Sequence, residues 1–306
     1  MELRHLRYFV TVAEEENVTR AAERLHISQP PLSRQIQDLE EELGVALFER
    51  TARTVRLTPV GRLFLVEARA VLQRADEAVQ RIRSTKGGME GDLAIGFAPS
   101  LTVELLPEAL RQFQKSFPKV KVSLRDLSSE EMIRGLHEGV IQLALMAHPG
   151  PKCAKGLSME KLRDYDLCVT LPPSHALAAR KTLRPVDLKG ERLLGYTRTG
   201  YPEYHEQVAE LLGSSKGKDS PVEEEYDSAT ALMAAVESGR GVALVASCFA
   251  KLAGTRLPVR PITPRTHAAT LSALWKGTKG KAPSGPAGHF LQVISDVSKR
   301  VKGEKE

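Results

Sequence analysis

The stretch TRAAERLHISQPPLSRQIQDLEEEL, from Thr19 to Leu43, predicts two helices joined by a tight turn. Thr19 can cap the first helix and Ser28 the second, because a hydroxyl oxygen at that position accepts from a first-turn N–H group. Pro30 and Pro31 then fall in the first turn of the second helix, where N–H groups have no intrahelical partner to lose. The two prolines are therefore compatible with a helix here.

The second helix has two chemically different faces. Its apolar residues recur at spacings of four, three and four, so they line one buried face: Leu32, Ile36, Leu39 and Leu43. The opposite edge carries hydroxyl, guanidinium and amide groups, which pair with base edges when such a helix enters a DNA major groove. The residues expected to contact DNA from this helix are Gln29, Pro30, Pro31, Ser33, Arg34 and Gln37. A two-helix hairpin with an ordinary polar outer face is the alternative.

A basic β-turn is predicted after the second helix. Val45–Phe48 and Val55–Leu57 are the expected strands, and the turn between them spans 49–54. Arginines on such a turn suit contact with phosphates or with a minor groove. The expected DNA contacts of the turn are Arg50, Arg53 and Thr54. This pattern favours a DNA reader over a solvent-exposed hairpin.

The run LRYFVTVAEEENVTRAAERLHISQPPLSRQIQDLEEELGVALFERTARTVRLTPVGRLFL, from Leu6 to Leu65, resembles the winged helix-turn-helix of LysR-type transcriptional regulators. The later chain fits this family too, so the resemblance covers the full length. It implies a multidomain fold, an all-α winged helix-turn-helix with a long linker helix, followed by a two-lobed α/β domain similar to type II periplasmic binding proteins. It also implies a transcriptional regulator that responds to a small-molecule effector between the lobes. A homotetramer, built as a dimer of dimers, would bind two DNA sites, bend the DNA and contact RNA polymerase.

A long helix is predicted after the turn. Thr58 and Pro59 form an N-cap and first-turn pair, and no Gly or Pro interrupts residues 62–86. Its apolar residues keep to one side at near-heptad spacing: Val60, Phe64, Val71, Ala78 and Ile82. An isolated helix would leave this stripe in water, so a homodimer through the linker is expected. Packing of the stripe on its own domain is the alternative.

The charge distribution adds a second argument for oligomerisation. The whole chain carries a net charge of +6, whereas residues 1–58 hold eight Arg, no Lys and ten acidic residues. The bulk charge of this module therefore gives no support to DNA binding, although its arginines gather on the recognition helix and the turn. A modest electrostatic attraction per module indicates that binding to double-stranded DNA needs more than one module.

Strands and helices alternate after the glycines at 87–88, which predicts an α/β domain with a mostly parallel sheet. The expected strands are Leu93–Phe97, Val120–Leu124, Ile141–Met146, Leu167–Leu171, Arg192–Tyr196, Val222–Tyr226, Val242–Val245 and Thr270–Trp275. The expected domains are 1–58 for DNA binding, 59–88 for the linker helix and hinge, and 89–306 for effector binding. Lobe I would comprise about 89–161 and 266–306, and lobe II about 162–265.

An effector cleft is expected where helices begin beyond the carboxyl ends of strands. Helix N-termini and hydroxyl groups there suit a small anion such as a carboxylate, so an organic acid is the favoured effector. The candidate contacts are Ser100, Thr102, Ser128, Ser129, Thr197 and Thr199. The resemblance implies effector contacts at Ser100 and Ser128 in particular. Simple caps and polar loop residues are the alternative for each of them.

Several function classes are excluded or disfavoured. The sequence has no Walker loop, HExxH or CxxC motif, so an enzyme is not expected. Cys153, Cys168 and Cys248 lack metal-ligand spacing with the histidines, so neither a metal nor another cofactor is expected. No signal-type segment and no long apolar run occurs, which favours a cytoplasmic protein without a membrane partner. A cytoplasmic solute-binding protein whose first 86 residues bind another protein is a further alternative.

Overall fold

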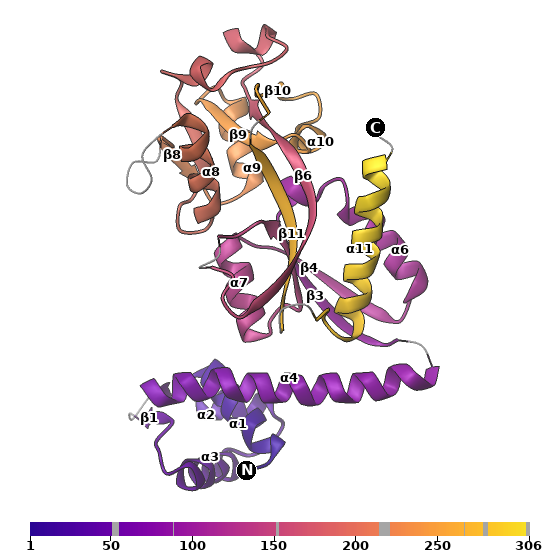
Figure 1. Cartoon of the computed structure of the whole chain (residues 1–306). Coiled ribbons are helices and arrows are strands. Elements are labelled where there is room, and N and C mark those ends of the chain that lie inside the picture. The colour runs from indigo at the N-terminus through magenta and orange to yellow at the C-terminus, as the bar shows by residue number, and fades with distance from the viewer. Residues whose placement is uncertain are drawn as a thin grey trace. The chain divides into compact units, whose positions relative to one another are not determined.

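The computed structural model describes residues 1–50, 55–87, 89–150, 153–213, 221–265, 267–277 and 281–303 (Figure 1). It divides into two compact units. The first contains Met1–Thr85 and His137–Gly139, and the second contains Lys86–Leu136 and Val140–Glu306. Each unit has an apolar core of its own.

The first unit packs three short helices and a two-stranded turn against the start of a long helix. Its elements are α1 (Leu3–Glu15), α2 (Val18–Arg24), α3 (Gln29–Leu43), β1 (Phe48–Arg50), β2 (Val55–Leu57) and α4 (Pro59–Gly87). Phe9 of α1 is fully buried, and its ring centroid lies 5.2 Å from that of Phe48 and 5.0 Å from that of Phe64. Because Phe64 belongs to α4, the first turns of the long helix form part of this core.

The helix caps partly confirm the sequence prediction. Ser28 is the N-cap of α3, although its side chain makes no capping hydrogen bond. The prediction that Thr19 caps the preceding helix was wrong. Asn17 takes that role, because its side-chain oxygen accepts from the backbone N–H groups of Thr19 and Arg20 at 2.9 and 3.1 Å. Helix α2 therefore begins at Val18.

The first strand of the turn is shorter than predicted. It begins at Phe48 rather than at Val45, because the preceding residues are hydrogen-bonded to the end of α3. Val45 N–H donates to the carbonyl of Glu40 at 3.2 Å, and the N–H groups of Leu47 and Phe48 donate to the Glu40 carboxylate at 2.8 and 2.9 Å. The Glu40 carboxylate therefore fixes the chain that follows the end of α3.

The predicted apolar stripe on α4 is divided between two faces. Val60 and Val71 are 45% and 43% exposed, as a dimerisation face requires. Phe64 instead packs into the core of its own unit, so the stripe prediction was wrong for this residue and the alternative holds there. Leu63 and Val66, which the prediction left out, are 71% and 47% exposed. Ala78 and Ile82 lie in α4, but their side chains are outside the described part of the chain.

The second unit is built on one sheet that runs through two lobes. Its strands are β3 (Gly91–Phe97), β4 (Val120–Asp126), β5 (Leu143–Ala147), β6 (Leu157–Thr170), β7 (Leu193–Tyr196), β8 (Glu224–Tyr226), β9 (Val242–Ala246), β10 (Val259–Pro261) and β11 (Ala268–Lys276). Their order is β4-β3-β5-β11-β6-β9-β7-β8, and β10 pairs with β6. Pairs at the two ends are parallel, whereas all pairs of β6 and β11 are antiparallel. The sheet is therefore mixed, and the prediction of a mostly parallel sheet was wrong.

Strands β6 and β11 connect the two lobes (Figure 1). They pair along their length, from Ala268 opposite Asp166 to Lys276 opposite Leu157. We name β3–β5, α5–α7 and α11 lobe I, and β7–β10 and α8–α10 lobe II. Strand β6 was predicted only from Leu167, because the charged residues between Leu157 and Leu167 hide its first half.

Helices cover both faces of the sheet. They are α5 (Pro99–Thr102), α6 (Leu106–Ser116), α7 (Ser129–Glu138), α8 (Pro202–Leu212), α9 (Ala229–Glu237), α10 (Phe249–Ala253) and α11 (Gly285–Gly303), with 3-10 turns η1 (Ala176–Ala179) and η2 (Pro185–Leu188). Leu93 and Ile95 of β3 share a core with α6 and α11, while Ala94 between them packs with Met132 of α7. This burial on both sides explains why β3 reads as an apolar run.

Three findings concern the described residues only. No described helix is long and apolar enough to cross a membrane. Within the same residues, no group of three or more His, Cys, Asp or Glu side chains is arranged to hold a metal ion. All three cysteines are free thiols, of which Cys168 and Cys248 are buried and Cys153 is exposed.

Candidate functional site

The exposed face of α3 carries the residues predicted to contact DNA. Leu32, Ile36 and Leu39 are buried on the inner face. The outer face presents Gln29, Pro30, Pro31, Arg34 and Gln37 as exposed residues and Ser33 as a half-buried one. The Gln29 amide donates to the Ser33 hydroxyl at 2.9 Å. This hydrogen bond orders the outer face of α3 at its first turn.

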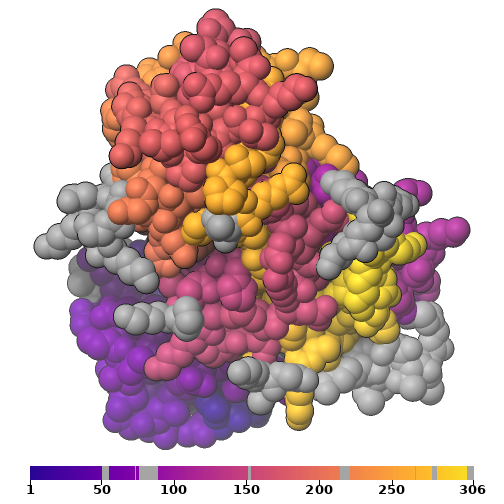
Figure 2. All heavy atoms as spheres, turned by 45° about the horizontal axis from the view of Figure 1, so that its top comes forward, coloured from indigo at the N-terminus to yellow at the C-terminus, as the bar shows by residue number. Residues whose placement is uncertain are grey.

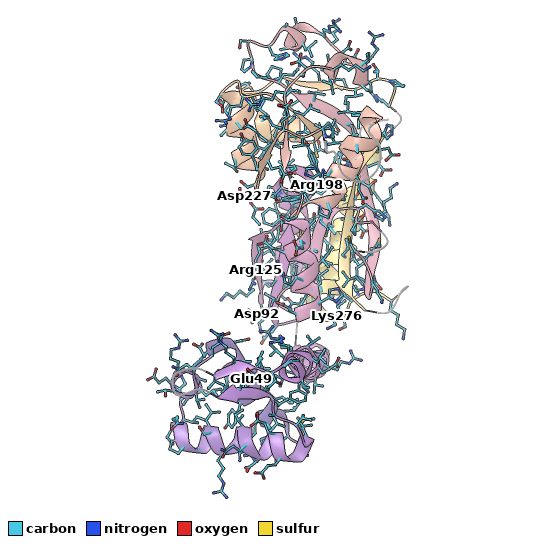
Figure 3. All side chains as sticks on the ribbon, turned by 90° about the vertical axis from the view of Figure 1, so that its left-hand side faces the viewer. Glu49, Asp92, Arg125, Arg198, Asp227 and Lys276 are labelled. Atoms are coloured by element: carbon cyan, nitrogen blue, oxygen red, sulfur yellow. The ribbon has the colours of Figure 1, made fainter. Side chains whose placement is uncertain are left out.

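The β-turn beside α3 is described only at its base. Strand β1 pairs with β2 so that Glu49 lies opposite Arg56 and Arg50 opposite Val55. Figure 3 labels Glu49 on this small sheet. Arg53 and Thr54, two of the predicted DNA contacts, lie outside the described residues, as does the side chain of Arg50.

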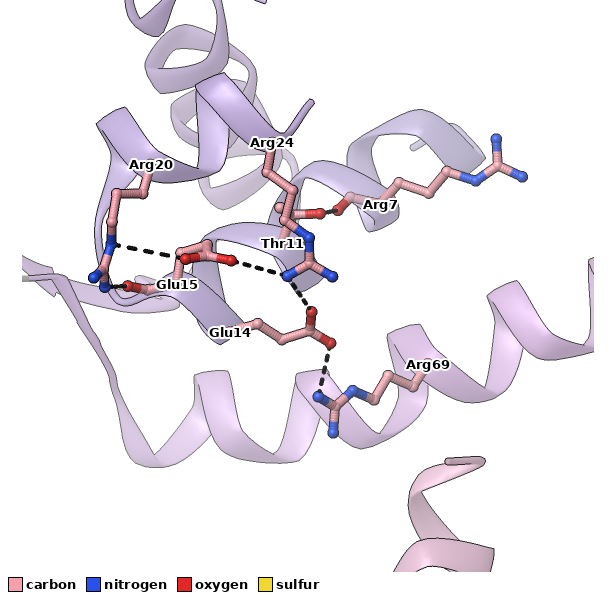
Figure 4. Close-up of polar contacts among 7 residues, drawn as sticks. All are labelled: Arg7, Thr11, Glu14, Glu15, Arg20, Arg24 and Arg69. Carbon is pink, nitrogen blue, oxygen red and sulfur yellow. Dashed lines mark hydrogen bonds and ion pairs between the residues drawn. The ribbon is translucent and has the colours of Figure 1, made fainter. Parts of the chain in front are cut away.

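Acidic residues of the first unit bind its arginines (Figure 4). Glu14 and Glu15 end α1, and both contact the Arg24 guanidinium, at 2.9 and 3.0 Å. Glu14 also binds Arg69 of α4 at 3.0 Å, and Glu15 binds Arg20. These ion pairs join α1, α2 and α4. Part of the acid in residues 1–58 therefore has a structural role, whereas Asp38, Glu41 and Glu42 are exposed on α3 itself.

The second unit contains a cavity of about 270 Å³ at the junction of its lobes. Lobe I contributes the beginnings of α5 and α7 and the end of β5, and lobe II contributes α8, α9 and the ends of β7 and β9. Ser129 is the first residue of α7, Glu203 the second of α8 and Ala229 the first of α9, and all three line the cavity. Three helix N-termini, each with a positive partial charge, therefore point toward it.

The predicted effector contacts divide into two groups. Ser100 and Ser129 line the cavity, whereas Thr102, Ser128, Thr197 and Thr199 are not among the lining residues. The Thr102 hydroxyl donates to the carbonyl of Ala98 at 2.9 Å and is buried. Thr199 is exposed.

Ser128 forms a capping box with Glu131. Its N–H and hydroxyl groups donate to the Glu131 carboxylate at 2.9 and 2.7 Å, and its hydroxyl accepts from the Glu131 N–H at 3.3 Å. Thr197 lies beside Gly200, where an added Cβ would be 2.8 Å from the Thr197 hydroxyl and 3.2 Å from the Ser128 Cβ. These two residues therefore shape the closure of the cleft from just outside the cavity.

The lobes are joined across the mouth of the cleft. The N–H of Glu130 in lobe I donates to the carbonyl of Gly200 in lobe II at 3.2 Å. The Ser129 hydroxyl donates to the Glu203 carboxylate. In the space-filling view of Figure 2, atoms of the two lobes touch on the face turned to the viewer. The structure thus has the two lobes closed on each other.

Sequence reasoning missed the aromatic and acidic wall of the cavity. Tyr201, Glu203, Tyr204 and Gln207 come from α8 or the residue before it, and this helix was not predicted. Pro202 at its first position was a usable signal, because proline is favoured there. The other missed polar or aromatic lining residues are Tyr196, His148 and Thr270.

The tyrosines form one packed cluster. The Tyr196 ring centroid lies 4.7 Å from that of Tyr201 and 5.1 Å from that of Tyr204. The Tyr204 hydroxyl donates to the carbonyl of Leu244 at 3.2 Å. Burial raises the pKa of Tyr196 to about 12, and the nearby Ser100 hydroxyl opposes this rise. The phenols therefore stay neutral at ordinary pH and can act as hydrogen-bond donors.

One carboxyl group faces the cavity. Burial raises the pKa of Glu203, while the hydrogen bond from Ser129 opposes the rise. His148 is the other titratable lining residue apart from the tyrosines, and its Nδ1 lies 3.0 Å from the Ser272 hydroxyl. Among the described lining residues there is no Lys or Arg. Arg125 and Arg198 are exposed outside the lining, in lobe I and lobe II respectively (Figure 3).

Comparisons with known proteins match both parts of the chain. Residues 3–62 match the family described as bacterial regulatory helix-turn-helix protein, lysR family, and residues 86–299 match the LysR substrate binding domain. The chain is 33% identical to the HTH-type transcriptional regulator AlsR of Bacillus subtilis over 305 residues, which is 99% of this chain and 98% of AlsR. It is 35% identical to the Hca operon transcriptional activator HcaR of Escherichia coli over 280 residues, covering 90% of this chain and 92% of HcaR.

A solved structure agrees with these sequence matches. The full-length regulator CbnR in complex with its target DNA superposes with a TM-score of 0.70 at 29% identity, covering 98% of this chain and 99% of CbnR. The matched proteins are regulators rather than enzymes, as the absence of catalytic motifs predicted.

Proposed function

Because the chain belongs to the LysR family of transcriptional regulators, we propose that an organic acid bound in the inter-lobe cavity controls how it acts on DNA. The family supplies the general function, which is DNA binding and transcription regulation tuned by an effector-binding domain. The convergence of α7, α8 and α9 supports the finer proposal, since three helix N-termini at one cavity favour a carboxylate. Ser100 and Ser129 are the proposed direct contacts, and Thr102, Ser128, Thr197 and Thr199 the proposed supports around them.

DNA recognition is proposed to use the outer face of α3 and the adjoining turn. The proposed contacts are Gln29, Pro30, Pro31, Ser33, Arg34, Gln37, Arg50, Arg53 and Thr54. The exposure of the α3 residues supports this, because their amide, hydroxyl and guanidinium groups are available to base edges. The proposed domain bounds remain 1–58, 59–88 and 89–306.

Assembly is proposed to couple the two functions. The exposed apolar residues of α4, Val60, Leu63, Val66 and Val71, support a homodimer through this helix. Two such dimers would form a homotetramer in the cytoplasm, and the homotetramer would bind neighbouring DNA sites. A change in the angle between the lobes would then alter the spacing of the DNA-binding modules, DNA bending and contact with RNA polymerase.

A thermal-shift screen of the purified full chain against small carboxylic acids tests the effector proposal. A ligand that binds only the folded state adds about 2.7 kcal/mol of stability at about a hundredfold excess over Kd. We expect a shift that Ser129→Ala reduces and that Ser116→Ala, an exposed site on α6, leaves unchanged. If every carboxylic acid leaves the melting temperature unchanged, the organic-acid proposal fails while the DNA-binding function stands.

A further inference from the structure

Glu203 gives the cavity a chemical preference that a carboxylate-binding site does not need. Resting on the proposed function, we infer that Glu203 is a specificity-determining residue that selects an effector with a hydrogen-bond donor, a hydroxyl or an ammonium group, at the end opposite its carboxylate. The effector would then be a short hydroxy acid or amino acid with an apolar middle, rather than a simple organic acid.

The first argument is the placement of the carboxylate. Glu203 lines the cavity, and the Ser129 hydroxyl donates to its Oε1 across the cleft. A carboxylate has about four lone-pair sites, so one bond from serine leaves acceptor capacity for a ligand. An effector that offers only a second carboxylate or an apolar end to Glu203 would leave this buried acceptor desolvated without compensation.

The second argument is the sign of the surrounding charge. The described lining residues include one carboxyl group and no Lys or Arg that could neutralise a ligand anion beside it. Glu206 acts on Glu203 in the same direction as burial, by disfavouring its charged form. Asp126 and Glu131 also act on Tyr201 as negative charges. A ligand anion directly beside Glu203 is therefore disfavoured and a donor there is favoured, whereas the helix N-termini favour a carboxylate elsewhere in the cavity.

The third argument is an unused donor elsewhere in the cavity. Tyr196 is 8% exposed, and its hydroxyl is buried without a hydrogen-bond partner among the described residues. It lies near the Ser100 hydroxyl without making an acceptable hydrogen bond to it. An orphan phenol next to a serine suits the carboxylate of a ligand, because buried polar groups in folded proteins are almost always paired.

Much of the remaining lining is apolar and aromatic. It includes Leu101, Leu167 and Leu244 together with the rings of Tyr201 and Tyr204. A cavity of about 270 Å³ limits the ligand to a compact body. The tyrosine faces also favour an ammonium group over a hydroxyl at the donor end, because a cation is attracted to aromatic rings.

Two matched ligand sets test the inference with the full chain. The first set is pentanoate, 5-hydroxypentanoate and 5-aminopentanoate, and the second is cyclohexanecarboxylate with its 4-hydroxy and 4-amino derivatives. Affinity is measured by thermal shift and calorimetry at up to about 10 mM, which detects millimolar binding. We expect a donor-bearing member of at least one set to bind about tenfold or more tightly than its parent acid, since a site built around a buried polar group discriminates against analogues that leave it unpaired.

Substitutions of Glu203 test whether its carboxylate causes the preference for a ligand with a hydrogen-bond donor. Glu203→Met removes the acceptor, so the parent acid and its derivatives should bind equally. Glu203→Gln keeps an acceptor without charge, so the hydroxy derivative should retain its advantage while the amino derivative loses it. Glu210→Gln is the matched control, because Glu210 lies on the same helix, is exposed and is outside the lining. Far-ultraviolet circular dichroism and DNA binding verify that each variant is folded.

The outcomes separate this inference from the proposed function. Parent acids that bind as tightly as their derivatives overturn the inference and leave the organic-acid proposal intact. Pentan-1-ol or pentylamine binding as tightly as the acid derivatives supports the role of Glu203 but removes the carboxylate. No stabilisation by any member overturns the inference, and the wider screen of carboxylic acids then decides the proposed function.

Discussion

Arg34 and Arg163 place the same side chain in opposite surroundings. Arg34 is exposed on the outer face of α3, where neighbouring polar groups also face solvent. The Arg163 side chain on β6 is 10% exposed and lies 3.9 Å from the carboxylate of Glu104, which is 4% exposed. The fold of the first unit does not depend on the polar face of α3, whereas at the lobe junction polar groups hold the structure together. A substitution on α3 should therefore change binding alone, and one at the junction should change stability as well.

Arg163→Met is expected to give the largest loss of stability. It leaves the buried Glu104 carboxylate with Lys251 at 3.4 Å and removes the guanidinium packed 5.3 Å from the Tyr165 ring centroid. Breaking one side of a buried ion pair costs about 3 kcal/mol or more. Chemical denaturation of the second unit measures the loss.

The double variant Glu104→Leu, Arg163→Met is the control for this expectation. Removing both charges abolishes the uncompensated carboxylate, so a large part of the stability should return. Equal losses in the single and double variants would mean that packing, rather than charge, explains the effect.

Arg34→Ala is expected to weaken DNA binding by about tenfold or more, since one good base contact contributes about 1–3 kcal/mol. Fluorescence anisotropy with duplexes selected from a random pool measures this, at several salt concentrations because binding is salt-dependent. The melting temperature should stay unchanged, in contrast to Arg163→Met. Gln35→Ala is the matched control on the same helix, because the Gln35 amide bonds Asp38 at 3.0 Å on a different side of α3 from Arg34. An equal loss for both variants would contradict a specific contact by Arg34.

Gly200→Ala is expected to open the cleft at a cost of about 1–2 kcal/mol, because a Cβ there is too close to Thr197 and Ser128. Relief of this contact would strain the hydrogen bond from Glu130 to Gly200 that joins the lobes. Gly150→Ala is a suitable control, since among the described residues its Cβ would meet only the Glu206 carboxylate, at 3.8 Å. Thermal melting compares the two glycine variants. An unchanged melting temperature for Gly200→Ala would show that closure of the lobes does not require the close approach of Gly200 to Thr197 and Ser128.

The two regions also differ in how much of them the sequence predicted. Helix α3 follows from local signals: Ser28 before it, prolines in its first turn, and Gly44 with φ of 68° after it. Its exposed row follows from helical spacing alone. The cap of α2 was misassigned because Asn17 and Thr19 are both good cap residues, and only the geometry of the N–H groups decides between them.

The cavity was predicted only in outline, because its residues meet through long-range packing. Ser100 and Ser129 were found from their positions after strands, but Tyr201, Tyr204 and Glu203 depend on α8, whose apolar pattern is short. The first half of β6 was missed because its partner β11, distant in sequence, stabilises it despite charged residues. Periodicity reports burial within one element and carries no information on which elements pair.

Glu131 and Glu203 give the smallest and most discriminating test. A neighbouring serine is hydrogen-bonded to each carboxylate, but the pKa values of the two groups are shifted in opposite directions. The Ser128 hydroxyl and N–H lower the pKa of Glu131, whereas burial raises the pKa of Glu203 despite its bond from Ser129. A lowered pKa contributes stability above the unfolded-state value that is lost as pH falls through the folded value. A raised pKa contributes stability below the unfolded-state value that is lost as pH rises through the folded value.

The signs for the two glutamine variants follow. At about pH 7.5, Glu131→Gln should melt below the original chain and Glu203→Gln above it. The difference for Glu203→Gln should shrink toward zero near about pH 4, below the unfolded-state pKa, whereas the difference for Glu131→Gln should persist there and be lost only at lower pH, as the pH falls through its lowered pKa. Melting curves across this range measure both variants under the same conditions, so each is the control for the other. A lower melting temperature for Glu203→Gln at about pH 7.5 would mean that the charged hydrogen bond to Ser129 outweighs burial. Glu203 would then mainly hold the two lobes together. A hydrogen-bond donor of the ligand would have to compete with the Ser129 hydroxyl for the Glu203 carboxylate.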